Sequence, residues 1–281
     1  MQRAVFIMFV AMSLIPAGDT AGKMLSANLG IAPLYVAWSR FLLGGLILLP
    51  FLPKGTWGLL LNWRIWFRAS FLAVGLSCIQ VALSREPIAD VFAAFFIAPL
   101  ISYVLAMIFL REPVTWQGSA LIILGFVGVL IVVQPGQPGQ PGSDAGAGLI
   151  WAIAAGVCYG AFLTASRWLS QVGTPVGLTF TQLLIAALLL TPFSLPDIPE
   201  MTNEVIWLTS LSALFSMLGN LILLYAYKIA PATRLAPLIY FQLLAAVILG
   251  WVFFETLPAL LTWVGLLIVM GAGITSARLR A

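Results

Sequence analysis

Three charged side chains interrupt the apolar segments near the start of the chain. Asp19 and Lys23 lie four residues apart, so a helix places them on one face, where they can form an ion pair. Arg40 stands in the next apolar segment. A charge in an apolar environment is costly unless it is paired, so each of the three is a candidate for function. Arg40 and Lys23 suit a carboxylate or phosphate, and Asp19 an amine. A charge network that only holds helices together is the alternative.

A second charged group, at the start of a later apolar segment, contains Arg85, Glu86 and Asp90. The internal repeat of the chain aligns Asp90 with Arg234, 144 residues later. We therefore predict gating or proton-coupling roles for these four residues. The alternatives are solvation of Arg85 and Glu86 at the surface, and an orientation-setting role for Arg234.

Neutral polar and aromatic residues also lie within the apolar segments. Buried amides and hydroxyls need hydrogen-bond partners, and aromatic rings can bind planar or cationic solutes. Further substrate-binding candidates are therefore Trp38, Tyr103, Tyr159, Gln182, Asn220, Tyr240 and Gln242. Hydrogen bonds between helices and ordinary packing are the alternative. Glu112 and Glu255 each follow an apolar segment, and we interpret them as structural caps or loop anchors.

The composition decides which elements carry these residues. Of the 281 residues, 62% are hydrophobic and 8% are charged, against about 25% charged in an ordinary soluble domain. So few polar residues cannot cover the helix faces of a soluble fold, which excludes soluble, disordered and nucleic-acid-binding proteins. The sequence has no histidine, and Cys78 and Cys158 both lie in apolar stretches. We therefore expect no metal site, no disulfide framework and no cofactor.

Apolar segments bounded by proline, glycine and charge predict ten membrane-spanning helices. They lie near residues 4–26, 33–52, 66–84, 88–110, 115–134, 148–168, 175–195, 205–228, 232–254 and 258–277. If the chain starts inside, most basic residues fall at the inner edge, as the positive-inside rule expects. These are Arg3, Lys54, Arg64, Arg68, Arg111, Arg167, Lys228, Arg234, Arg278 and Arg280. Both termini are then cytoplasmic. A cleaved signal peptide over residues 1–18 is the alternative.

The two halves of the chain are similar to each other. Residues 33–51 align without gaps on residues 175–193, an offset of 142 residues. A second set of matches at an offset of 144 pairs Trp63 with Trp207. The chain therefore contains two copies of one five-span unit.

We divide the chain into a first repeat at residues 1–134, a Gly/Pro linker at 135–147 and a second repeat at 148–281. Because five spans is an odd number, the second repeat must enter the membrane inverted. Inverted repeats are typical of secondary transporters, whose substrate site lies where the repeats meet.

Each half also has a proline before its fourth span and a glutamate after it. The segments are PIADVFAAFFIAPLISYVLAMIFLREPVTW and APATRLAPLIYFQLLAAVILGWVFFETLP. This arrangement resembles the EamA-type transporters of the drug/metabolite transporter superfamily over nearly the whole chain. The resemblance implies an all-α integral membrane fold, with ten helices in two inverted five-helix EamA repeats around a central cavity. Arg111 departs from the family pattern, which usually has glycine before the glutamate.

A narrower resemblance concerns the first two spans. Asp19-x-x-x-Lys23, followed by Trp38-Ser39-Arg40, is similar to the bacterial branch that includes S-adenosylmethionine carriers. The second half has no charged partners for Asp19, Lys23 and Arg40, so the roles of these residues cannot be mirrored onto it.

These features predict a transporter and not an enzyme. The expected substrate is a small polar or zwitterionic metabolite, such as an amino acid, an amine or a nucleoside-containing compound, moved by alternating access. Secondary-active transport, exchange and facilitated diffusion all remain open, as do protons or a counter-transported solute as coupling partners, and a monomer or a dimer. A multidrug exporter, a membrane-embedded enzyme and a channel are the alternatives. No nucleotide-binding G-x-x-x-x-G-K-[ST] motif occurs. We expect a multi-pass protein in the cytoplasmic (inner) membrane of a bacterium.

Overall fold

The long apolar segments form α-helices, which satisfy every backbone hydrogen-bonding group within the segment itself. A computed structural model describes residues 2–83, 94–133, 147–254 and 260–278, and this part contains no β-strand. In the first half the helices are α1 (Gln2–Leu29), α2 (Pro33–Leu48), α3 (Trp63–Leu83), α5 (Ala98–Phe109) and α6 (Trp116–Val133). In the second half they are α7 (Ala147–Trp168), α8 (Pro175–Ser194), α9 (Asn203–Ile229), α10 (Ala232–Ile239), α11 (Phe241–Phe254) and α12 (Leu260–Arg278). Short 3-10 helices cover Leu49–Phe51, Thr56–Leu61 and Leu195–Asp197.

Proline and threonine fix where several helices begin. Pro33 and Pro175 occupy the first turns of α2 and α8, where a missing N–H costs nothing. The side chain of Thr174 accepts a hydrogen bond from the Gly177 backbone N–H at 3.1 Å, and Thr202 caps α9 in the same way. The predicted segment 232–254 is broken in the structure at Tyr240 into α10 and α11. Pro237, three residues earlier, removes a backbone donor from α10.

Six helical segments of the described chain are long and apolar enough to cross a membrane. They are Arg3–Ser26, Pro33–Phe51, Ile150–Trp168, Pro175–Asp197, Asn203–Ile229 and Ala232–Phe253. Three shorter apolar helical segments accompany them: Ala98–Phe109, Trp116–Ile131 and Trp263–Thr275. Many large apolar side chains are exposed on the bundle, as on a surface that faces lipid. The chain is therefore an all-helical, multi-pass membrane protein.

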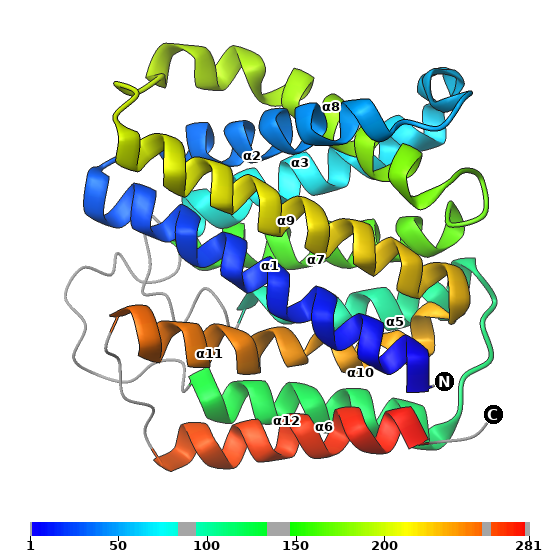
Figure 1. Cartoon of the computed structure of the whole chain (residues 1–281). Helices are drawn as coiled ribbons and strands as arrows, with labels where there is room; N and C mark the ends of the chain where they lie inside the picture. Colours follow the sequence, from blue (N-terminus) through cyan, green and yellow to red (C-terminus); the bar gives the residue numbers. More distant parts are fainter. Residues whose placement is uncertain (1, 84–93, 134–146, 255–259, 279–281) are drawn as a thin grey trace.

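Helices of the first half pack mainly against helices of the second half. α1 packs on α9 and α11, while α7 packs on α3 and α5; α2 packs on α9, while α8 packs on α3. α2 also packs on α8, and α6 lies beside α12 at one edge of the bundle (Figure 1). If each helix is exchanged with its counterpart in the other half, the same pairs are regenerated. The pattern of contacts between the two halves is thus symmetric.

Two glycines illustrate this relation at atomic scale. A Cβ on Gly219 of α9 would lie 2.7 Å from the Ile15 side chain of α1, and one on Gly75 of α3 would lie 3.1 Å from Cβ of Cys158 on α7. Gly219 follows Gly75 by 144 residues, the offset found in the sequence. Glycine thus allows the same close helix approach once in each half.

The bundle has two distinct ends. α1 begins and α12 ends at the same end, which we call the terminal end (Figure 1). Exposed basic residues lie there, at Arg3, Lys54, Arg64, Arg111 and Lys228. Exposed acidic residues lie near the opposite end, at Asp197, Glu200 and Glu204. The exposed positive and negative charges thus lie at opposite ends of the bundle, because successive membrane-spanning segments run in opposite directions.

Candidate functional site

A buried guanidinium connects three helices from both halves of the chain. Arg40 of α2 is only 4% exposed, and its Nη1 donates to Asp19 Oδ1 of α1 at 2.6 Å. Its Nε donates to Ser212 Oγ of α9 at 2.6 Å, and its Nη2 donates to the Gly18 carbonyl at 2.8 Å. We call this group the Arg40 junction. It fixes Asp19 through a charge-assisted hydrogen bond.

The junction depends on a glycine in α1. A Cβ on Gly22 would overlap Nη2 of Arg40, so only glycine leaves room for the guanidinium against α1. The partners are unequally covered, because the Asp19 side chain is 44% exposed while Arg40 is buried. The junction therefore presents an accessible carboxylate that is held in place by a buried cation.

The structure pairs Asp19 with Arg40, across two helices, where the spacing in the sequence suggested pairing with Lys23. Lys23 lies one turn further along α1 and is half-buried. Trp38 faces another neighbour, since its Nε1 donates to Thr191 Oγ1 of α8 at 3.0 Å. The structure thus brings Asp19, Lys23 and Arg40 to one region and places Trp38 at the contact between α2 and α8.

A second buried guanidinium connects α3, α7 and α8. Arg68 has no exposed surface, although the charge pattern of the sequence placed it at a membrane edge. Its Nε donates to Ser166 Oγ at 2.9 Å, its Nη1 to the Leu178 carbonyl at 3.1 Å, and its Nη2 to Gln182 Oε1. The Phe162 ring lies 5.0 Å from the guanidinium carbon. Within the described residues Arg68 has no carboxylate partner, and we call this group the Arg68 junction.

The two junctions use positions that match between the two halves. Gln182 follows Arg40 by 142 residues, and Ser212 follows Arg68 by 144. In the Arg40 junction the arginine comes from the second span and the serine from the eighth; in the Arg68 junction the arginine comes from the third span and the amide from the seventh, so both arginines belong to the first half. The repeat offset of 144 residues aligns Arg68 with Ser212, a polar residue, and this match could have revealed Arg68 as a buried residue.

Tyr159 and Asn220 carry buried polar atoms without a hydrogen-bond partner among the described residues. The Tyr159 ring lies 5.4 Å from Phe95 and 5.8 Å from Phe162, and its hydroxyl is unpaired. Asn220 Nδ2 donates to the Ser216 carbonyl at 2.9 Å, while its Oδ1 is unpaired. Both residues therefore keep a buried polar atom that a ligand or a water molecule could satisfy.

The remaining predicted aromatic and amide residues lie elsewhere. Tyr103 shares a hydrogen bond of 3.0 Å with Ser119 Oγ of α6, and Tyr240 packs on Phe96 with ring centres 6.3 Å apart. Both tyrosines belong to a hydrophobic cluster of α5, α6, α10, α11 and α12. Gln242 is buried on α11, and its Oε1 is unpaired among the described residues. The structure does not bring these three side chains to the Arg40 junction.

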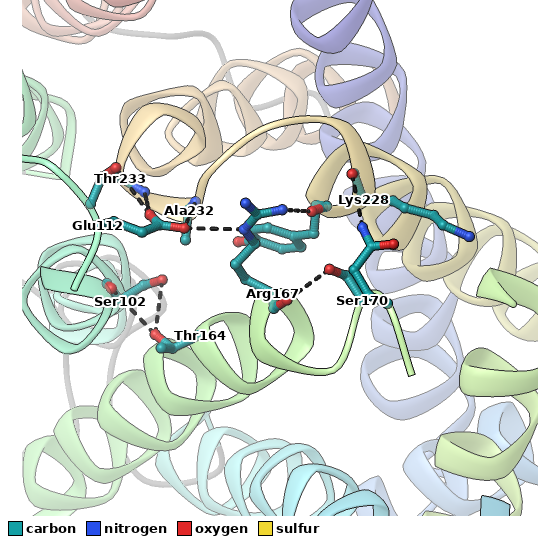
Figure 2. A network of polar contacts seen from close by, with 10 residues as sticks. Ser102, Glu112, Thr164, Arg167, Ser170, Lys228, Ala232 and Thr233 are labelled. Carbon is teal, nitrogen blue, oxygen red and sulfur yellow. Dashed lines mark hydrogen bonds and ion pairs between the residues drawn. The ribbon is translucent and has the colours of Figure 1, made fainter. Parts of the chain in front are cut away.

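A third polar group lies at the terminal end, around Glu112 (Figure 2). Its carboxylate accepts bonds from the Ala232 N–H at 3.1 Å, the Thr233 N–H at 2.9 Å and Thr233 Oγ1 at 3.0 Å. It also accepts from Arg167 Nε of α7 at 3.1 Å, while Arg167 Nη1 donates to the Tyr227 carbonyl at 2.6 Å. Glu112 therefore caps α10, as expected for a structural cap. We call this group the Glu112 junction.

A cavity of about 430 Å³ adjoins the Glu112 junction and opens at the terminal end. Its walls come from the segment after α5, the end of α7 and the turn from α9 to α10. They contain Leu110, Glu112, Arg167, Trp168, Ser170, Gln171, Lys228, Ile229, Ala230 and Pro231. We call it the terminal-end pocket.

The predicted gating residues are only partly within the described chain. Arg85, Glu86 and Asp90 lie outside the described residues, as does Glu255. Arg234 is half-buried in the first turn of α10, directly after Thr233. In the described part of the chain, the cation that pairs with Glu112 is Arg167. The sequence alone indicates Arg167 only as a basic residue that sets the orientation of the chain in the membrane. Arg167 lies 144 residues after Lys23, a candidate site residue, and this match could have pointed to more than an orientation-setting role for Arg167.

Curated relatives match almost the whole chain. An S-adenosylmethionine uptake transporter of Rickettsia bellii is 26% identical over 268 residues, which cover 91% of this chain and 87% of the relative. A riboflavin transporter of Brucella anthropi is 24% identical over 276 residues, 95% of each chain. A crystal structure of a protein that is 17% identical superposes with a TM-score of 0.78 over 99% of each chain, which supports the fold.

The family comparison covers both halves. The model of the EamA-like transporter family matches twice, at residues 2–134 and 146–276. The chain therefore contains two EamA repeats, and it belongs to the EamA-like transporter family, whose members are transporters and not enzymes.

Proposed function

We propose that the chain moves a small polar metabolite across the cytoplasmic membrane of a bacterium by alternating access, using ten spans in two inverted repeats. The exchange of helix partners between the halves supports this proposal, as do the matching glycine contacts at Gly75 and Gly219. The proposed boundaries remain residues 1–134, 135–147 and 148–281. The basic residues at the terminal end favour cytoplasmic termini.

The observation that carries the substrate proposal is the accessible Asp19 carboxylate on a buried Arg40. Three N–H groups of Arg40 already donate to Asp19, Ser212 and Gly18. Arg40 therefore acts as a positioning residue, and Asp19 is the group that meets a cation. Lys23, one turn away, suits a carboxylate of the same ligand. The site favours a zwitterionic metabolite with a separate positive charge.

The names of the relatives agree with this chemistry to different degrees. S-adenosylmethionine carries a sulfonium, an amine and a carboxylate, and thus offers both charges that the Asp19 region can pair. Riboflavin is uncharged at neutral pH, so its recognition would depend on stacking with rings such as Tyr159. We therefore propose S-adenosylmethionine or a similar cationic nucleoside as the substrate class, with riboflavin as the second candidate. Asp19 is also the group best placed to exchange a proton if transport is proton-coupled.

Purified protein in liposomes tests the proposal. Labelled S-adenosylmethionine should enter preloaded liposomes in a saturable manner and exchange with unlabelled substrate. The Asp19→Asn variant, which keeps an oxygen for Arg40 but loses the charge, should abolish this uptake. Saturable flux of riboflavin but not of S-adenosylmethionine would transfer the proposal to the second candidate. Flux of neither, or flux of hydrophobic cationic drugs alone, would contradict a metabolite carrier.

A further inference from the structure

The Glu112 junction joins the two repeats at the terminal end. Glu112 belongs to the first repeat, and the four hydrogen bonds to its carboxylate come from the second repeat, through Arg167, Ala232 and Thr233. Its side chain is only 8% exposed, whereas Arg167 is 27% exposed. Two functions thus meet in one carboxylate: it pairs with a cation of α7 and caps the N-terminus of α10.

A cavity and a buried polar pair both adjoin the junction. Glu112 and Arg167 line the terminal-end pocket, which is open at the end of the bundle. One turn before Arg167 on α7, the buried Thr164 hydroxyl bonds to Ser102 of α5 at 3.3 Å (Figure 2). Because Ser102 and Thr164 belong to different repeats, this polar pair also lies where the halves meet.

From this arrangement we propose that the Glu112 junction is the gate of the carrier at its terminal end, an inference that rests on the proposed transport function. When the gate is closed, as here, the four bonds to Glu112 hold the segment after α5, the end of α7 and the start of α10 together. When it opens, Glu112 leaves Arg167 and the start of α10, and the terminal-end pocket becomes continuous with the region of Ser102 and Thr164.

This assignment differs from the expectation for Arg234. Arg234 follows Thr233 in α10, but in the described chain it is Arg167 that reaches the carboxylate. The gate therefore uses a cation from α7 and backbone donors from α10. A carboxylate at position 112 suits both partners, since a helix N-terminus favours a negatively charged acceptor and Arg167 is a cation.

Thiol labelling of a buried reporter tests the gate without a transport assay. The reporter is Thr164→Cys in a Cys78→Ala/Cys158→Ala background, and the purified protein is treated with a charged maleimide. With Glu112 intact, labelling should be slow, because only the open population reacts. Glu112→Ala should accelerate labelling about tenfold, and Arg167→Ala by a smaller factor, because Glu112 then still caps α10. Glu204→Ala, which removes an exposed carboxylate near the opposite end, is the matched control and should leave the rate unchanged.

Unchanged labelling in a monodisperse Glu112→Ala protein would overturn the gate. If Glu112→Ala does not fold, Arg167→Ala and Glu112→Gln decide the question, and an unchanged rate in both would overturn it equally. An equal acceleration by Glu204→Ala would also refute a specific gate. Because labelling needs no substrate, a failure of S-adenosylmethionine transport in liposomes would count against the proposed function and leave the labelling result to decide the gate by itself.

Discussion

The Arg40 and Arg68 junctions each place a buried arginine of the first half against helices of the second half, but they balance its charge differently. Arg40 has an accessible carboxylate, Asp19, as its partner. Arg68 donates to a hydroxyl, a carbonyl and an amide, and has no carboxylate partner in the described chain. The Arg40 junction therefore exposes a carboxylate, which we propose meets the ligand, while the Arg68 junction is closed.

This difference in the partners of the two arginines shows how a duplicated chain can carry an exposed carboxylate at only one of two similar junctions. Both arginines connect three helices, so both stabilise the contact between the repeats. At the α1 position that corresponds to Ser166 the chain has Gly22, and the guanidinium of Arg40 occupies the space that a side chain would fill. In the other half, Ser166 itself accepts the bond from Arg68. Small changes at matching positions thus separate the proposed ligand site from the closed Arg68 junction.

Removing Arg68 should have the largest effect on stability. Arg68→Ala leaves the buried Gln182 Oε1 without its donor, at roughly 1–3 kcal/mol for an unsatisfied group, and also removes the charged bonds to Ser166 and to the Leu178 carbonyl. We expect a loss of about 3 kcal/mol or more, measured by thermal unfolding of the purified protein. Arg40→Ala should cost less, because Asp19 can turn to solvent and Ser212 keeps its bond to Gly18. Equal losses in the two variants would remove the distinction between the junctions.

Gly22→Ala should disrupt the Arg40 junction alone. The new Cβ would displace the guanidinium, and Asp19 would lose its positioning partner. We expect ligand affinity to fall about tenfold or more, which corresponds to about 1.4 kcal/mol, as measured by titration of the purified protein. Gly271→Ala is the control, because nothing lies within 4 Å of a Cβ there. If both variants bind equally well, the packing of Arg40 against Gly22 does not support the site.

Asp19→Asn should separate ligand binding from folding. The amide oxygen can still accept from Arg40, so the unfolding free energy should change by about 1 kcal/mol or less. Affinity for a cationic ligand should nevertheless fall about tenfold to a hundredfold, because the site loses its negative charge and keeps the positive charge of Arg40. Parallel binding and unfolding measurements check this prediction. A large loss of stability with retained affinity would make Asp19 structural.

The two serine variants should lose less stability than Arg68→Ala, and they compare the junctions directly. Ser166→Ala removes one of the neutral acceptors of Arg68 and should cost about 1–2 kcal/mol. Ser212→Ala removes an acceptor of Arg40, whose charge is still balanced by Asp19, and should cost less. Thermal unfolding of both variants in the same detergent provides the measurement. The reverse order would show that the Arg40 junction is the more structural of the two.

The sequence predicted the class of the protein and part of the site for a clear physical reason. Charges in apolar segments are rare and costly, so Asp19 and Arg40 stood out before their contact was known. Their pairing could not be predicted, because a spacing of four within one helix also fits Lys23, and contacts between helices depend on packing. Glu112 was expected as a cap, since it follows a helix and precedes a break.

The positions of other residues could not be predicted, because their side chains are compatible with more than one location in a membrane protein. Arg68 lies near the start of its helix, where a basic residue ordinarily sets orientation, and only the packing of α7 and α8 buries it. Tyr103 and Tyr240 are aromatic residues in apolar segments, which fits both a cavity wall and a helix contact. The break between α10 and α11 required the local effect of Pro237 within a continuous apolar run.

The most direct test of the account is the shift in unfolding temperature that S-adenosylmethionine causes in three proteins: the parent chain, Asp19→Asn and Arg68→Lys. A ligand that binds only the folded state raises this temperature. We predict a rise for the parent chain, no rise for Asp19→Asn, and a rise for Arg68→Lys from a lower starting temperature. An equal rise for the parent chain and Asp19→Asn, or its loss in Arg68→Lys alone, would contradict the assignment of the ligand to the Arg40 junction.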